Sequence, residues 1–130
     1  MALVAATAFV STDVGADLST HAVGLGGTIR GRASGSGLPL YLVPADRAPH
    51  RYPCHGNGIC EPVAKRPPGP PFVLLGRLRR TASFYARQRF AFPVPRGIAP
   101  GLYRLFLYCR PCGGSLIQSG PLRGETLRIG

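Results

Sequence analysis

The stretch that decides the fold class is residues 102–109, LYRLFLYC. Side chains that alternate between two sides at a period of two residues are typical of a β-strand. One side carries Tyr103, Leu105, Leu107 and Cys109, and the other carries Arg104, Phe106 and Tyr108. We therefore expect this stretch to form the strongest strand of the chain.

Six further segments have the character of short strands bounded by Gly and Pro, which mark turns. They cover residues 26–31, 38–43, 72–78, 89–94, 115–118 and 125–129. The first two are predicted to form a hairpin or a neighbouring pair, and Gly76 marks a candidate bulge in the third. Residues 79–88 are the one stretch compatible with a short helix. About seven short strands in a chain of 130 residues with 18 Gly and 14 Pro predict one all-β sandwich domain.

The chain is strongly basic, with 16 basic and 5 acidic residues and a net charge of +11. Lys65 is the only lysine. A coding bias toward Arg and Ala explains this ratio without any binding role. The functional interpretation is an anionic partner, such as a cell-wall polymer, an acidic lipid headgroup or nucleic acid.

Arginine and aromatic residues are interleaved in residues 77–90, RLRRTASFYARQRF. This pattern suits anionic polymers, including single-stranded nucleic acid, through charge and stacking. The alternative is a solvated connection whose aromatic side chains enter the core. The candidate anion-binding residues are Arg77, Arg79, Arg80, Arg87 and Arg89.

The first sixteen residues have part of the pattern of a secretory signal peptide. A short apolar run, residues 3–10, is followed by Val14-Gly15-Ala16, small residues of the kind that precede a cleavage site. The basic region that normally begins a signal is missing, as it would be if the start site were assigned too far downstream. We expect residues 1–16 to be a signal-peptide remnant and residues 17–130 to be the domain; a first strand or a tail is the alternative.

Residues 44–71 form a long connection that is rich in proline and contains Cys54 and Cys60. A structureless connection of this length is unusual in a compact domain, so something should hold it down, and the cysteines are the obvious candidates. Its last part, Pro67-Pro68-Gly69-Pro70-Pro71, is expected to be an extended spacer.

The four cysteines fall in two close pairs, Cys54 with Cys60 and Cys109 with Cys112. In an exported chain they would oxidise to two disulfides, and turn residues flanking each pair favour local pairing over cross pairing. The alternative is a four-cysteine zinc site, in which Cys109-x2-Cys112-Gly resembles a zinc knuckle and His50 or His55 replaces one ligand. Redox catalysis by Cys109 and Cys112 is disfavoured because no helix is expected to begin at Cys109.

No catalytic constellation is recognisable. The sequence has no nucleophile elbow, no phosphate-cradling loop and no paired carboxylates. The three histidines, His21, His50 and His55, lie in loop-like sequence, where a surface position is the simplest interpretation and a copper or zinc site with Cys54 is the alternative. We predict that the protein is not an enzyme and needs no cofactor.

Residues 92–103, FPVPRGIAPGLY, resemble the corner of immunoglobulin-like and prealbumin-like sandwich modules. In such folds a Tyr that opens a strand returns its hydroxyl to the corner backbone, which would make Tyr103 that residue and Pro100-Gly101 the corner. Residues 72–129 also resemble the carboxy-terminal half of small secreted actinobacterial sandwich proteins, through Tyr108-Cys109, Cys112 and the Ser115-Leu116-Ile117 strand. The resemblance implies an immunoglobulin-like or prealbumin-like sandwich, and a fold does not define a function.

The sequence thus predicts an extracellular or cell-envelope module, non-catalytic, with a role in adhesion, scaffolding or binding of an anionic envelope polymer, and without a transmembrane segment. The alternative is an intracellular zinc-stabilised nucleic-acid-binding protein. Stoichiometric zinc without disulfides would favour the alternative, and two disulfides without metal would exclude it.

Overall fold

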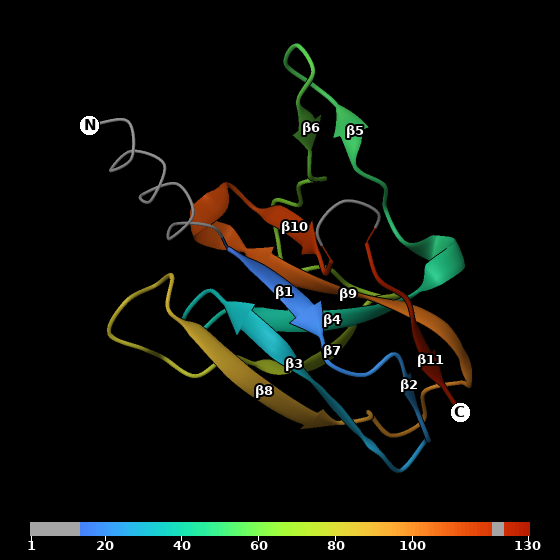
Figure 1. Cartoon of the computed structure of the whole chain (residues 1–130). Coiled ribbons are helices and arrows are strands. Elements are labelled where there is room, and N and C mark those ends of the chain that lie inside the picture. The colour runs from blue at the N-terminus through green and yellow to red at the C-terminus, as the bar shows by residue number, and fades with distance from the viewer. Residues whose placement is uncertain (1–13, 121–123) are drawn as a thin grey trace.

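Two antiparallel sheets lie face to face across a hydrophobic core in the computed structural model, which describes residues 14–120 and 124–130 (Figure 1). The smaller sheet has three strands in the order β1-β3-β8. Its strands are β1 (Gly15–Leu18), β3 (Thr28–Ser34) and β8 (Arg87–Pro93). The sandwich class expected from the sequence is therefore confirmed.

The larger sheet has six strands, with the order β2-β11-β9-β4-β7 and β10 also paired with β9. Only the β2–β11 pair is parallel. The strands are β2 (Ala22–Val23), β4 (Pro39–Pro44), β7 (Val73–Arg77), β9 (Gly101–Cys109), β10 (Ser115–Gln118) and β11 (Leu127–Ile129). A separate two-stranded ribbon consists of β5 (Tyr52–Pro53) and β6 (Ile59–Cys60).

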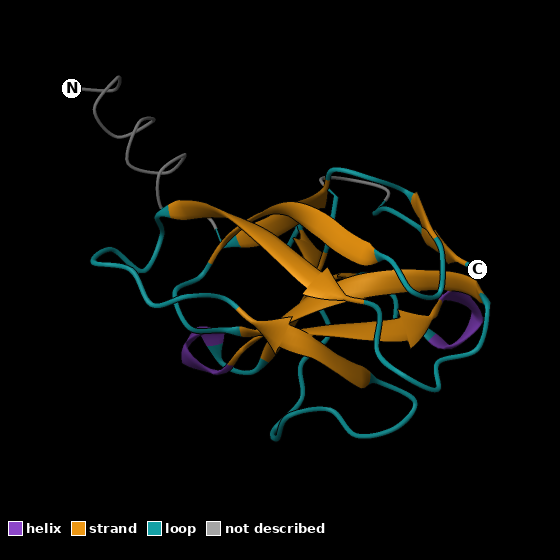
Figure 2. Ribbon diagram, turned by 90° about the horizontal axis from the view of Figure 1, so that it is seen from below, coloured by secondary structure: helices purple, strands orange, loops and turns teal. Residues whose placement is uncertain are grey.

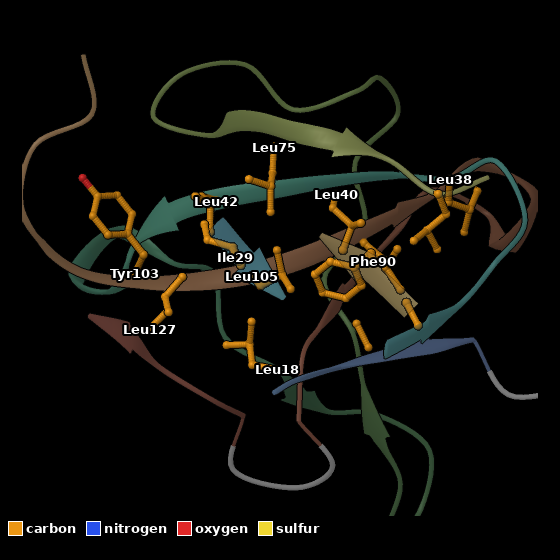
Figure 3. Close-up of a cluster of buried hydrophobic side chains, with 14 of the residues drawn as sticks. Leu18, Ile29, Leu38, Leu40, Leu42, Leu75, Phe90, Tyr103, Leu105 and Leu127 are labelled. Carbon is orange, nitrogen blue, oxygen red and sulfur yellow. The ribbon is translucent and has the colours of Figure 1, made fainter. Parts of the chain in front are cut away.

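The alternation of β9 places its two sides in two different hydrophobic clusters, as its sequence predicts. Tyr103, Leu105, Leu107 and Cys109 belong to the main core between the sheets. In that core Leu40 and Leu42 of β4 meet Ile29 of β3 and Phe90 of β8 (Figure 3). Because apolar side chains from both sheets are removed from water here, this cluster is the main source of stability.

The other side of β9 belongs to a second cluster on the outer face of the larger sheet. Its buried members are Tyr41, Val43, Ala48, Phe106, Tyr108 and Leu116. Ala64 of the proline-rich connection and Phe72, which directly follows that connection, pack against them. Phe72 contacts Phe106 edge-on, with ring centroids 5.7 Å apart, and the Tyr108 hydroxyl donates to the Ala64 carbonyl at 2.9 Å. The connection is thus the cover of this outer face.

The corner before β9 has the hydrogen bond that the sequence suggested. Tyr103 donates its hydroxyl to the carbonyl of Ala99 at 2.5 Å, across Pro100 and Gly101. Gly101 has a φ of +154°. The side chain of Tyr103 is buried, so the bond ties the turn to the core.

Several local predictions need correction. Residues 79–88 contain no helix; the two helices of the described residues are single turns, η1 (Ala45–Arg47) and η2 (Arg110–Cys112) (Figure 2). A short helix therefore does begin directly after Cys109. The described residues hold eleven strands rather than seven: β2, β5 and β6 have two residues each and leave no period in the sequence, and β1 begins within the segment expected to be a signal-peptide remnant.

The predicted pairing of residues 26–31 with 38–43 is also wrong. β3 and β4 belong to different sheets, and the turn between them crosses from one sheet to the other. Main-chain bonds from Gly35 and Ser36 to the Phe84 carbonyl hold this crossing. The bulge is found where Gly76 predicted it: the register of β4 with β7 shifts between Leu40 and Tyr41.

The boundary placed after Ala16 falls inside β1. Gly15 and Ala16 pair with Ser34 and Ala33, and the Ala16 side chain is buried in the core. The folded domain therefore includes these two residues of the sixteen. Residues 1–13 lie outside the described part of the chain.

Candidate functional site

The outer face of the three-stranded sheet carries a group of arginines. On β3, Ile29 and Ala33 point into the core, so Arg30 and Arg32 point to solvent. On β8, Gln88 and Phe90 are buried, and Arg87 and Arg89 are exposed by the same alternation. We call Arg30, Arg32, Arg87 and Arg89 the arginine face.

The register of the two strands sets the spacing of these charges. Arg32 lies directly opposite Arg89, and Arg30 lies opposite Ala91. Directly opposed residues of an antiparallel pair have Cβ atoms about 5 Å apart, and alternate residues of one strand are about 7 Å apart. The side chains of Arg32 and Arg89 therefore leave the sheet side by side. Those of Arg30 and Arg87 lie two residues further along β3 and β8.

One carboxylate reaches this face. Asp17 of β1 lies opposite Arg32 in register and accepts a hydrogen bond from Nη2 of Arg87 at 3.0 Å. Within the described ranges, no carboxylate lies within ion-pair distance of Arg30, Arg32 or Arg89. The central part of the arginine face consequently has uncompensated positive charge.

Such an arrangement is unfavourable for the free protein, because like charges directly across two strands repel each other. Charged residues on an edge strand often serve to prevent sheets from associating, which explains Arg87 and Arg89 on the open edge β8. This explanation does not extend to Arg30 and Arg32. They lie on β3, which is hydrogen-bonded to β1 on one side and to β8 on the other.

Shallow hollows join the arginines into one surface. A hollow of about 390 Å³ is lined by Arg30, Arg32 and Arg89, and one of about 280 Å³ by Arg32, Arg87 and Arg89. A third of about 140 Å³ lies between Arg89 and the arginines Arg77 and Arg79. Arg89 lines all three hollows and is the centre of the surface.

Gly31, between the two arginines of β3, allows the sheet to sit tightly on the core. A Cβ on Gly31 would lie 2.5 Å from the Cζ atom of Phe90 and 2.3 Å from the carbonyl oxygen of Asp17. The Phe90 ring thus lies under the arginine face and supports it. An alanine at position 31 would force both neighbours to move.

Gln88 fixes the approach of Arg79 to this surface. Its buried side-chain amide accepts from the Arg79 main-chain N–H at 3.0 Å and donates to the Arg79 carbonyl at 2.8 Å. The connection after β7 is thereby pinned to β8. Of the five arginines singled out in the sequence, Arg77, Arg79, Arg87 and Arg89 meet here, whereas Arg80 lies beside Gly37 and lines none of the three hollows.

Arg30 and Arg32 were not among the residues expected from the sequence. A signal for them is the alternation of residues 28–34, TIRGRAS, in which charged residues alternate with small or apolar residues. The two arginines are separated from the continuous basic stretch 77–90 by more than forty residues, so the sequence does not group them with it. The structure assembles the arginine face from two strands that are distant in sequence.

The cysteines form two local disulfides, Cys54–Cys60 and Cys109–Cys112. Sulfur atoms joined in disulfides offer no thiolate to a metal, so the four-cysteine zinc alternative has no ligands. No group of three or more His, Cys, Asp or Glu side chains suited to a metal ion occurs in the described part of the chain. Neither disulfide ties residues 44–71 to the sheets, contrary to expectation; the side chains of the second cluster do this instead.

Glu61 and Glu125 have structural contacts. Glu61 accepts from Nε of Arg51 at 2.5 Å and from the Gln118 main-chain N–H at 3.2 Å. Glu125 accepts from the Leu18 main-chain N–H and contacts the His21 ring, both at 2.9 Å. Each carboxylate therefore holds two segments of chain together.

Comparison with known proteins adds no family to this picture. No protein-family model matches the chain, and no curated protein is significantly similar to it. Among the described residues, no helix has the length and apolar character needed to cross a membrane. The features of the described residues that bear on function are therefore the arginine face and the two disulfides.

Proposed function

We propose that this protein is a secreted, non-catalytic β-sandwich module of the cell envelope, of the immunoglobulin-like or prealbumin-like kind, that binds an anionic polymer on its arginine face. One observation carries the proposal. Arg32 and Arg89 lie side by side on a solvent-facing sheet surface, and among the described residues neither is within ion-pair distance of a carboxylate, since Asp17, opposite Arg32, is bound by Arg87. An anionic ligand relieves their repulsion and takes up the hydrogen bonds of both guanidinium groups.

A polymer is favoured over a small molecule by the shape of the surface. The three hollows are open and adjoin one another, so they follow the sheet rather than enclose a ligand. Arginines whose Cβ atoms are spaced by about 5–7 Å suit a chain with repeated phosphate, sulfate or carboxylate groups. Guanidinium groups bind such oxyanions in a forked geometry.

The extracellular location is supported by the disulfides. Disulfide bonds persist outside the reducing cytosol, and two of them in a small chain are typical of exported proteins. The intact mass of protein recovered from culture medium, measured before and after reduction, tests the location. Protein found only inside the cell with reduced cysteines would contradict it.

The binding function is tested with a triple variant, R30Q/R32Q/R89Q, against a matched control, R47Q/R96Q/R110Q. The control removes the same charge from exposed arginines outside the arginine face. The probes are polyphosphate, poly-L-glutamate and a single-stranded DNA oligomer, titrated by fluorescence anisotropy at several salt concentrations.

The triple variant should bind the preferred probe at least about 30-fold more weakly at low salt, and its slope of log K against log salt should be smaller by about 2. The control should lose less than about threefold, because distant surface charges are screened. Equal losses in the two variants would mean that only the net charge matters, and the proposal would be wrong. The ranking of the probes identifies the oxyanion.

A further inference from the structure

The ribbon formed by β5 and β6 projects from the sandwich as a separate finger (Figure 1). It belongs to neither of the two large sheets. Tyr52 lies opposite Cys60, and Pro53 lies opposite Ile59, so the Tyr52 and Ile59 side chains point to opposite sides of the ribbon. Both are exposed, Tyr52 at 46% and Ile59 at 64%.

The finger is rigid in spite of its small size. An isolated two-stranded ribbon is marginally stable in water, and here the Cys54–Cys60 disulfide closes it. In the turn, the Cys54 N–H donates to the Gly58 carbonyl at 3.1 Å and the Gly58 N–H donates to the His55 carbonyl at 2.7 Å. The apolar side chains are therefore held in water by a covalent link rather than by a core.

The base of the finger is clamped to the sandwich. Arg51 directly precedes β5, Glu61 directly follows β6, and Nε of Arg51 donates to Oε1 of Glu61 at 2.5 Å. Glu61 also accepts from the N–H of Gln118, while Nη2 of Arg51 donates to the carbonyls of Gln118 and Gly120 at 3.3 and 3.2 Å. The finger thus has a fixed direction relative to the larger sheet.

The chemistry of the finger differs from that of the rest of the protein. Residues 52–60, YPCHGNGIC, contain no Asp, Glu, Lys or Arg, although the chain carries a net charge of +11. The carboxylate at its base, Glu61, is neutralised by Arg51. Beyond it come the exposed Val63 and two exposed cations, Lys65 and Arg66.

A finger without Asp, Glu, Lys or Arg that exposes an aromatic and an aliphatic side chain, on a basic body, matches the interface of an anionic bilayer. Tyr is favoured at the headgroup level, where its ring meets acyl chains and its hydroxyl meets water. Basic residues add electrostatic attraction to anionic lipid. A protein groove would contact one side of the ribbon, whereas a fluid bilayer contacts the opposite sides of Tyr52 and Ile59 together.

We propose that the β5–β6 finger inserts into the headgroup region of anionic lipid bilayers and docks the protein on the membrane surface. The finger and the arginine face have no residue in common. The bound polymer and the membrane are therefore separate ligands.

The experiment uses the absence of tryptophan from the chain. An Ile59→Trp variant provides one indole on the β6 strand of the finger, next to its turn, and its emission is recorded with two kinds of vesicle. One kind is phosphatidylcholine alone, and the other contains about one third phosphatidylglycerol, an anionic lipid. A blue shift and an intensity gain with the anionic vesicles only is the expected result.

Binding is then measured by vesicle co-sedimentation for Ile59→Asp and for a matched control, Leu25→Asp, which changes another exposed aliphatic residue in the same way. Ile59→Asp should reduce the partition coefficient at least about tenfold, because a carboxylate resists transfer into an anionic interface. Leu25→Asp should reduce it less than about twofold, since screened surface charges contribute little.

An emission spectrum unchanged by anionic vesicles, or equal binding by the two aspartate variants, would overturn the proposal and leave a protein partner as the occupant of the finger. The triple variant R30Q/R32Q/R89Q separates this outcome from a failure of polymer binding. If that variant loses vesicle binding while Ile59→Asp keeps it, the arginine face is the lipid site and the finger is not.

Discussion

The outer faces of the two sheets differ in exposure: one is covered by another part of the chain, and the other is open to solvent. The larger sheet hides Tyr41, Phe106 and Tyr108 under the proline-rich connection, which forms a second hydrophobic cluster there. The smaller sheet leaves its outer face in water and presents arginines. One face is thus used to build the domain, and the other remains available for binding.

The difference shows how a sandwich divides its surfaces between stability and function. Strand β9 is apolar on both sides, so burying only one side would leave Phe106 and Tyr108 in contact with water. Strand β3 alternates charged and uncharged residues, so its outer side is soluble without a cover. The long connection is accordingly a structural element of the domain.

The largest expected effect that tests this comparison is that of Phe106→Ala. Phe106 is completely buried in the covered face, so the loss of its ring should lower the free energy of unfolding by about 3–5 kcal/mol. Leu102→Ala, an exposed position on the same strand, should change it by less than about 0.5 kcal/mol. Urea denaturation measures both. Similar values for the two variants would show that the covered face does not stabilise the domain.

A smaller effect is expected for Tyr108→Phe, which keeps the ring and removes the hydroxyl. The Ala64 carbonyl then loses the bond at 2.9 Å, and the free energy of unfolding should fall by about 1–2 kcal/mol. Limited proteolysis should also cut residues 61–72 faster than in the parent protein. An unchanged cleavage rate would mean that the aromatic contacts alone hold the cover.

The smallest effect is expected on the exposed face of the smaller sheet, where a substitution should raise the free energy of unfolding instead of lowering it. Arg89→Gln removes one of two opposed like charges and should raise the free energy of unfolding by about 0.5 kcal/mol at low salt. The gain should disappear at high salt, where the repulsion is screened. The same variant should bind anionic polymer more weakly. A destabilised Arg89→Gln protein at low salt would show that Arg89 has a structural role.

Sequence patterns were most informative where one strand carried the whole signal. The side-chain alternation of β9 and the bulge at Gly76 are local features that were predictable from a few neighbouring residues, and the Tyr103 corner was implied by the resemblance of residues 92–103 to sandwich modules. The arginine face was only half predictable. Arg87 and Arg89 belong to a basic stretch that is visible in the sequence. Arg30 and Arg32 become part of the arginine face only because β3 pairs with β8.

The proline-rich connection is a segment whose structural role could not be predicted from the sequence pattern. Proline and glycine remove the periodicity from which a strand is inferred, so residues 44–71 gave no sign of the covering role. The β5–β6 finger was invisible for the same reason, since strands of two residues cannot alternate. Its clamp through Arg51 and Glu61 depends on Gln118, far along the chain.

The sequence by itself determined the strand-rich class and the alternation of the two sides of β9, because side-chain period acts within a few residues, and it favoured local pairing of the cysteines while leaving a zinc site as the alternative. Only the tertiary structure decided which sheet each strand joined, which face received a cover, and that Arg32 would lie beside Arg89. Strand partners are selected by burial across the whole core, and this selection brings together residues whose spacing along the chain contains no record of their contact.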